Sequence, residues 1–209
     1  MINTTRLRCT IGWLGMLLPW MVLALAMAYG YGFPESISQT YYFESCTTPF
    51  MIILGAAGLL LFSYKGYDKQ DDIVCTLAGV FGLGICIFPC AVSTLLDTDR
   101  LVGTFQIVEN VSGLIHNICA ALFFGLLAYN SLFLFTKSGG TVTENKKKRN
   151  VIFRVCGIGM IASFLVLVPV TICEWHGGVW AVEAIALAFF GISWLTKADY
   201  YPWLFADKK

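Results

Sequence analysis

Charged residues are scarce in this sequence. Asp, Glu, Lys and Arg together make up 13% of its 209 residues, whereas hydrophobic residues make up 57% and aromatic residues 15%. In soluble domains about a quarter of the residues are charged, so this deficit argues against a soluble fold. We therefore expect most of the chain to lie in a membrane.

The signature motifs of common catalytic and cofactor sites are missing as well. The chain has no Walker A loop, dinucleotide-binding fingerprint, Gly-x-Ser-x-Gly elbow or His-Glu-x-x-His pair. It has two histidines, and none of its eight cysteines belongs to a Cys-x-x-Cys pair. We expect no cofactor and no bound metal, and we interpret most cysteines as small buried hydrophobic residues. A disulfide between Cys46 and Cys173, which lie near expected helix ends, stays open at this stage.

What the sequence does contain is six long apolar runs joined by short polar connectors. A membrane-spanning helix needs about 20 mostly apolar residues. The runs predict helices at about 10–29, 49–64, 73–96, 111–135, 155–173 and 179–195. Because the connectors leave almost nothing for a soluble domain, we predict an all-α fold in which residues 1–209 form a single transmembrane domain, a polytopic bundle of six helices.

Glycine and proline inside these runs predict details of packing. Gly55 and Gly58 in the second run are spaced as small residues are where another helix approaches closely. Pro89 predicts a bend toward the end of the third helix.

The distribution of positive charge predicts the orientation. All but one of the 14 Lys and Arg residues fall on one side of the expected membrane, and Arg100 is the exception. Cytoplasmic loops carry the excess of Lys and Arg. We therefore predict a multi-pass protein of the cell membrane with both termini cytoplasmic, and with the connectors near residues 35, 100 and 176 outside.

The most basic connector predicts a partner. Four consecutive cations precede the fifth run, and clusters of this kind beside a helix attract anionic lipid: Lys146, Lys147, Lys148 and Arg149. No folded basic domain accompanies them, so we expect membrane lipids and no nucleic acid as partners.

Two ionisable side chains inside the apolar runs are the candidate catalytic residues. His116 lies about one turn into the fourth expected helix and Glu183 about one turn into the sixth, so both should lie at one depth near the outer surface. Ionisable groups at membrane depth usually face the bundle interior or a wet cavity and often mark function. The candidate ligand-binding residues at this level are Ser93, Asp97, Ser112, His116, Asn117, Trp180 and Glu183.

Other interpretations of the residues at the depth of His116 and Glu183 stay open. Two imidazoles and several carboxylates could hold a divalent metal, although neither His116 nor His176 has the spacing of a ligand pair. A serine hydrolase trio of Ser93, His116 and Asp97 can be assembled on paper, as it can from any polar loop region. In the simplest interpretation, Glu183 is hydrogen-bonded to a neighbour and fixes the packing of the fourth and sixth helices.

Several segments together resemble a family of small bacterial membrane proteins of unknown function. The similar segments are SISQTYY at 36–42, LFSYKGYD at 61–68, Phe88-Pro89, Ile115-His116, Phe123-Phe124, RNVIFRVCG at 149–157, and Glu183 followed by FGISWLTK at 190–197. The resemblance covers nearly the whole chain and implies a six-helix membrane protein, without an activity.

Two further membrane-protein families can be compared with the chain. The chain is distantly similar to the Frag/DRAM/Sfk membrane proteins, which implies a link to lipid and membrane homeostasis. It departs from the alkaline ceramidases and progestin-type receptors, because two histidines cannot complete their zinc set of three His, one Asp and one Ser.

Three functions follow as hypotheses. The first is a non-enzymatic protein that binds a lipid or small amphiphile in an outward-facing pocket between the third, fourth and sixth helices. The second is an intramembrane hydrolase or transferase in which His116 is the base and Glu183 its electrostatic partner. The third is a small proton-coupled transporter that uses Glu183. A bound metal would favour the second, and a pocket continuing through the bilayer the third.

Overall fold

The computed structural model of the protein describes residues 4–92, 100–138, 140 and 142–200. Six long helices dominate it: α1 (Thr4–Ala28), α2 (Glu44–Phe62), α3 (Lys69–Ile87), α4 (Glu109–Tyr129), α5 (Glu144–Ile172) and α6 (Gly178–Lys197). A π-helical turn, η2 (Asn130–Leu134), extends α4. All six are long and apolar enough to cross a membrane, which confirms the predicted all-α bundle of six helices.

The observed helix bounds differ from the predicted ones where local chemistry decides. The third helix was expected to bend at Pro89 and continue to residue 96, but it ends at Ile87. Residues that precede proline are pushed out of the helical region, and Phe88 is accordingly extended. The fifth helix begins at Glu144 rather than near 155, because the Thr143 side chain caps it by accepting from the Lys146 amide.

Two short elements were not predicted. A turn of 3-10 helix, η1 (Ser38–Tyr42), lies between α1 and α2. Strands β1 (Leu101–Val102) and β2 (Ile107–Val108) form an antiparallel hairpin before α4. Both elements lie in the connectors that pack against the helix ends, and η1 takes part in the site described below.

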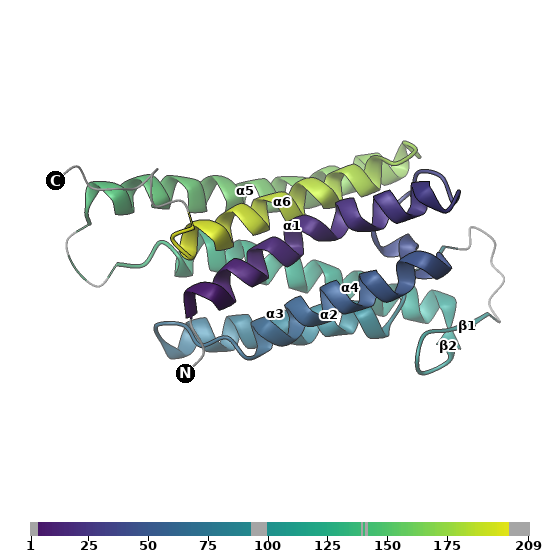
Figure 1. Ribbon diagram of the computed structural model, residues 1–209, viewed down its shortest axis with the longest axis horizontal. Helices are drawn as coiled ribbons and strands as arrows, with labels where there is room; N and C mark the ends of the chain where they lie inside the picture. Colours follow the sequence, from purple (N-terminus) through teal and green to yellow (C-terminus); the bar gives the residue numbers. More distant parts are fainter. Residues whose placement is uncertain (1–3, 93–99, 139, 141, 201–209) are drawn as a thin grey trace.

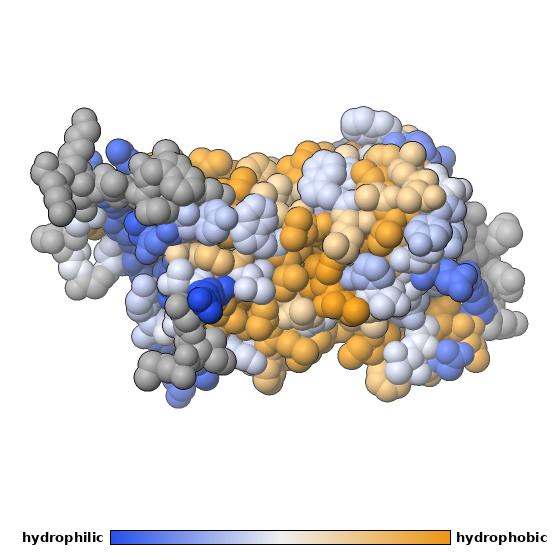
Figure 2. Space-filling view, in the orientation of Figure 1, coloured by the Kyte–Doolittle hydropathy of each residue, from blue (hydrophilic) through white to orange (hydrophobic). Residues whose placement is uncertain are grey.

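The helices form a ring in chain order. Each helix packs against its neighbours in sequence, and α6 closes the ring against α1. Figure 1 shows the helices side by side along the long axis, with the start of α1 and the end of α6 at the same end. We call this the terminal end, and we call the opposite end, which carries the β-hairpin, the hairpin end. Hydrophilic residues gather at both ends and hydrophobic residues cover the middle, as a membrane-spanning protein requires (Figure 2).

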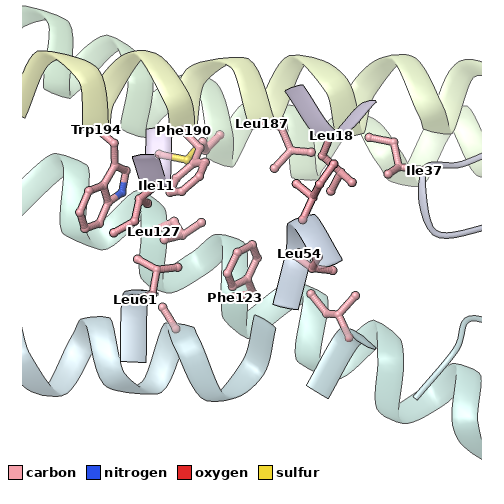
Figure 3. Close-up of a cluster of buried hydrophobic side chains, with 14 of the residues drawn as sticks. Ile11, Leu18, Ile37, Leu54, Leu61, Phe123, Leu127, Leu187, Phe190 and Trp194 are labelled. Carbon is pink, nitrogen blue, oxygen red and sulfur yellow. The ribbon is translucent and has the colours of Figure 1, made fainter. Parts of the chain in front are cut away.

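The core fills the ring with large side chains from every helix. Trp194 of α6 is buried, and its ring makes edge contacts with Tyr64 and Phe135 at centroid distances of 5.1 and 5.2 Å. Phe190, Ile11, Leu127 and neighbouring residues continue this cluster along the axis (Figure 3). The bundle is therefore tightly packed along this part of its axis.

Glycine allows α2 and α3 to approach each other closely. A Cβ atom on Gly79 would lie 2.5 Å from the Gly58 carbonyl oxygen and 2.5 Å from the Phe62 backbone nitrogen. Of the two glycines from which we predicted a close approach, Gly58 makes it, whereas a Cβ on Gly55 would meet nothing within 4 Å.

Gly79→Ala should therefore destabilise the bundle by about 1–3 kcal/mol, because the added methyl group meets backbone that cannot move aside. Unfolding of the purified protein by a denaturing detergent would measure the loss. Gly55→Ala is the matched control and should leave stability unchanged or slightly higher, since alanine favours helix. Equal effects of the two substitutions would contradict the described packing of α2 on α3.

Candidate functional site

His116 lies on the inner face of α4 and is held by two hydrogen bonds. Its side chain is 4% exposed. Nδ1 lies 2.8 Å from the Phe88 carbonyl oxygen, and Nε2 lies 3.0 Å from Ser38 Oγ. Because a carbonyl only accepts, Nδ1 must carry the proton, which leaves Nε2 of the neutral ring to accept from the Ser38 hydroxyl. The imidazole is thus fixed in orientation and in tautomer.

Glu183 lies on α6 and is held by the same connector that holds His116. Its Oε2 accepts a hydrogen bond from the Ile37 amide at 2.7 Å. Ile37 and Ser38 are consecutive, so adjacent residues of the α1–α2 connector contact the two candidate residues. Among the described residues, no hydrogen bond joins His116 to Glu183 directly. The pair expected from the sequence is therefore linked through the chain between α1 and α2.

That connector is itself anchored to the start of α6. The Trp180 amide donates to the Glu35 carbonyl at 2.9 Å, and the Gly177 amide donates to Glu35 Oε2 at 3.0 Å. Glu35 also pairs with His176, and both side chains are mostly exposed. These contacts fix the position from which Ile37 and Ser38 reach Glu183 and His116.

A cavity of about 490 Å³ opens beside the pair. Most of its lining is apolar, and five polar side chains, His116, Asn117, Ser163, Thr171 and Glu183, interrupt it. The apolar lining is Ala120, Phe124, Phe164, Leu167, Val168, Ile172, Val179, Val182 and Ala186. The volume is within the usual range of small-molecule sites, about 300–1,000 Å³.

The helices that line this cavity differ from those that we predicted. We expected a pocket between the third, fourth and sixth helices, but the lining comes from α4, α5 and α6. The helix ring explains the difference, because α5 follows α4 and separates it from α6 over much of the bundle. Residues 164, 167, 168 and 171 lie on one face of α5 and form the wall that the sequence argument missed.

The other expected ligand-binding residues divide into three groups. Asn117 lines the cavity with His116 and Glu183. Ser112 does not, because its hydroxyl donates to the Pro89 carbonyl at 2.8 Å. Trp180 packs its ring edge-on against Trp20 and Phe33. Ser93 and Asp97 lie outside the described residues, and with them the drawn serine hydrolase trio.

Two features of this end were missed or left open. Glu109, assigned to a connector, is the first residue of α4 and is 1% exposed; its Oε1 accepts from the Val92 amide at 2.7 Å, and Oε2 lies 3.7 Å from Arg100 Nη1. It fastens the segment after α3 to α4.

Cys46 and Cys173 form no disulfide, since all eight cysteines are free thiols. Within the described residues, no three His, Cys, Asp or Glu side chains gather closely enough to hold a metal ion.

Comparisons with known proteins add no relative. No protein-family model matches the chain, and searches of curated proteins and of solved structures also find no match. The family resemblances described above therefore stay predictions.

His116→Ala should lower the free energy of unfolding by about 2 kcal/mol, because it leaves the Phe88 carbonyl and the Ser38 hydroxyl without their partner. His176→Ala is the matched control: its pair with Glu35 is exposed, and surface pairs are worth roughly 0.2–1 kcal/mol. Thermal unfolding in the same detergent measures both. A loss for His176→Ala as large as that for His116→Ala would show that His116 is not the anchored residue.

Proposed function

We propose that the protein is a multi-pass protein of a bacterial inner membrane and that its α4–α5–α6 cavity binds a lipid or small amphiphile. The observation that carries the proposal is one cavity with apolar walls and a carboxylate and an imidazole among its few polar side chains. An amphiphile matches both parts of this surface. The resemblance to small bacterial membrane proteins supports the choice of membrane.

The orientation follows from the charges at the two ends. The Lys and Arg residues of the terminal end lie on α1, α3, α5 and α6 and in the connectors after α2 and η2. In the hairpin-end connectors, Arg100 is the one Lys or Arg in the sequence. The positive-inside rule then assigns the terminal end to the cytoplasm. With both termini cytoplasmic, the cavity faces the outer leaflet, where outer-leaflet lipid has direct access to it.

The exposure of the lining supports entry from the bilayer. Val168, Thr171 and Ile172 line the cavity and are also exposed on the outer surface of α5. Asn117 is exposed on α4 across the same seam. An acyl chain can therefore lie between α4 and α5 against Phe124 and Leu167 while its polar head reaches Glu183 and His116.

Photolabelling can test this binding. We expect a monoacylglycerol with a diazirine in its chain to label wild-type protein in vesicles on the segments 117–124 and 179–186. Val168→Trp places a large side chain at the seam and should reduce this labelling about fivefold, the effect of losing roughly 1 kcal/mol of contact.

Leu165→Trp is the matched control for Val168→Trp. Leu165 lies on α5 three residues away, is 69% exposed and does not line the cavity, whereas Val168 is 60% exposed and does. Labelling of the two segments should be unchanged in this variant. Equal labelling of both variants, or labelling spread evenly over the lipid-facing surface, would rule out the cavity as the binding site.

A second candidate function is hydrolase or transferase chemistry, and the Ser38–His116 contact favours it. A hydroxyl donating to a neutral imidazole, which a third group orients, is the arrangement of a nucleophile and its general base. Here Ser38 supplies the hydroxyl, His116 the base, and the Phe88 carbonyl the orienting group. The Ser38 proton would pass to Nε2 as its oxygen added to the carbonyl carbon of an ester or amide, with the π electron pair moving to the carbonyl oxygen. On collapse of this adduct the alcohol or amine would leave and take the proton from the imidazolium, and water would then release the acyl group from Ser38. Glu183, the partner expected from the sequence, lines a smaller cavity of about 40 Å³ together with Ser38.

A fluorophosphonate probe tests this second candidate. An activated Ser38 should react with the probe in wild-type protein, and Ser38→Ala should abolish the labelling. Ser36→Ala, two residues away, is the control and should label normally. Absence of labelling at Ser38 in folded protein would leave the Ser38–His116 contact with a structural role only.

We do not extend the proposal to transport. The cavity lining ends at Phe124, Ser163 and Ala186, and the packed side chains of Phe123, Phe190 and Trp194 lie below it. A transporter would need a second arrangement of these helices to continue the path.

A further inference from the structure

A second cavity lies at the terminal end, opposite the amphiphile site, and its lining is basic. Its volume is about 560 Å³. Five cationic side chains and two carboxylates line it: Arg8, Lys137, Lys146, Arg149 and Lys197, with Asp68 and Asp199. They come from α1, the connectors after α2 and η2, α5, α6 and the residues after α6. The fold thus gathers cations that are far apart in the sequence.

Two of these cations are already paired. Lys137 Nζ donates to Asp68 Oδ2 at 2.8 Å, and this hydrogen bond lowers the pKa of Asp68 and raises the pKa of Lys137. Both groups are therefore ionised at neutral pH and cancel locally. Arg149 forms an ion pair with Asp199. The two carboxylates of the lining are thus matched by these two cations.

Within the described ranges, three of the lining cations have no carboxylate at ion-pair distance. Among the described residues, no Asp or Glu oxygen lies within 4.0 Å of the charged nitrogens of Arg8, Lys146 or Lys197. Aromatic rings hold Lys197 instead, with Nζ 4.5 Å from the Tyr67 centroid and 4.9 Å from that of Phe135. Rings orient an ammonium group without neutralising it.

Donors remain available for an added anion. Lys146 Nζ uses one proton on the Phe135 carbonyl, at 2.7 Å, and an ammonium has three. Thr196 also lines the cavity, and its buried Oγ1 has no hydrogen-bond partner in the described part of the chain. Cations with no counter-ion and a hydroxyl with no hydrogen-bond partner among the described residues together form a site for an anion with several oxygen acceptors.

We propose that this basic cavity binds a phosphate group, with Lys197, Lys146 and Arg8 as its cationic ligands. Phosphate oxygens accept several charge-assisted hydrogen bonds at once, which suits three cations from three helices. The cavity lies where six apolar spans end, at the depth of lipid headgroups. A phosphomonoester on a lipid and a free phosphate share this chemistry. The proposal is independent of the amphiphile site, which lies at the other end of the bundle.

The structure also divides the basic segment from which we expected lipid binding. Lys146 and Arg149 line the cavity, whereas Lys147 and Lys148 do not and are exposed. Lys147 pairs with Glu144 at the surface. Binding should therefore depend on Lys197 and Lys146 and be insensitive to Lys148, although all three lie at the same end and carry the same charge.

The experiment uses the full chain purified in detergent, with two probes. Inorganic phosphate is titrated directly, and native mass spectrometry counts phosphatidic acid retained from mixed micelles, with diacylglycerol of the same chains as the phosphate-free control. Lys197→Gln should weaken phosphate-dependent binding about tenfold, the effect of losing roughly 1.4 kcal/mol. Lys197→Arg should retain binding, and Lys148→Gln should leave it unchanged.

The outcomes separate the two sources of phosphate. Tenfold weakening seen with inorganic phosphate supports a site for free phosphate, and weakening seen with phosphatidic acid alone supports a lipid headgroup site. If Lys197→Gln does not fold, Lys146→Gln on the first turns of α5 replaces it with the same expectation. Equal weakening by Lys148→Gln, retention of diacylglycerol equal to that of phosphatidic acid, or no binding of either probe would overturn the proposal.

Discussion

The connector between α1 and α2 is the part on which the arrangement of the hairpin end depends. Through Ile37 and Ser38 it places one hydrogen bond on Glu183 and one on His116. A carboxylate and an imidazole at membrane depth are costly unless they are bonded, and this connector supplies the bonds from backbone amide and hydroxyl. Glu35 in turn anchors the connector to the start of α6. Helices α4 and α6 are thus held in place relative to each other, because one short segment contacts both of them at defined atoms.

That spacing explains why a cavity exists at all. The ring of helices is tightly packed where Trp194, Phe190 and Leu127 meet, and glycines bring α2 against α3. Toward the hairpin end, by contrast, α4, α5 and α6 enclose open volume lined mostly by apolar side chains. The polar groups that tie α4 and α6 to the connector lie at the edge of this volume. His116 and Glu183 therefore both hold the helices to the connector and face the cavity in which we propose that an amphiphile binds.

The sequence predicts the number and order of the spans because hydrophobicity and length decide them, whereas Pro89 and the Thr143 cap decide where α3 ends and α5 begins. Ionisable residues inside apolar runs stand out, which is why the sequence draws attention to His116 and Glu183, and the structure places both in the lining of one cavity. The sequence could not predict Ser38, because a serine in a polar connector carries no periodic signal, nor could it show that Phe88 would leave the helix and offer its carbonyl. The α5 wall was missed because an aliphatic face of a span has the same composition whether it faces lipid or a cavity. The sequence could not show that Lys197 lines one cavity with Arg8 and Lys146, because these residues are far apart along the chain.

The measurement that tests the central claim most directly is an experimental structure of the protein in lipid nanodiscs, at a resolution that shows bound lipid. We expect elongated density in the cavity between α4, α5 and α6, with its polar end beside Glu183 and His116 and its chain against Phe124 and Leu167. A seam between α4 and α5 closed by side chains, with no density inside it, would rule out amphiphile binding there and leave His116 and Glu183 as structural anchors.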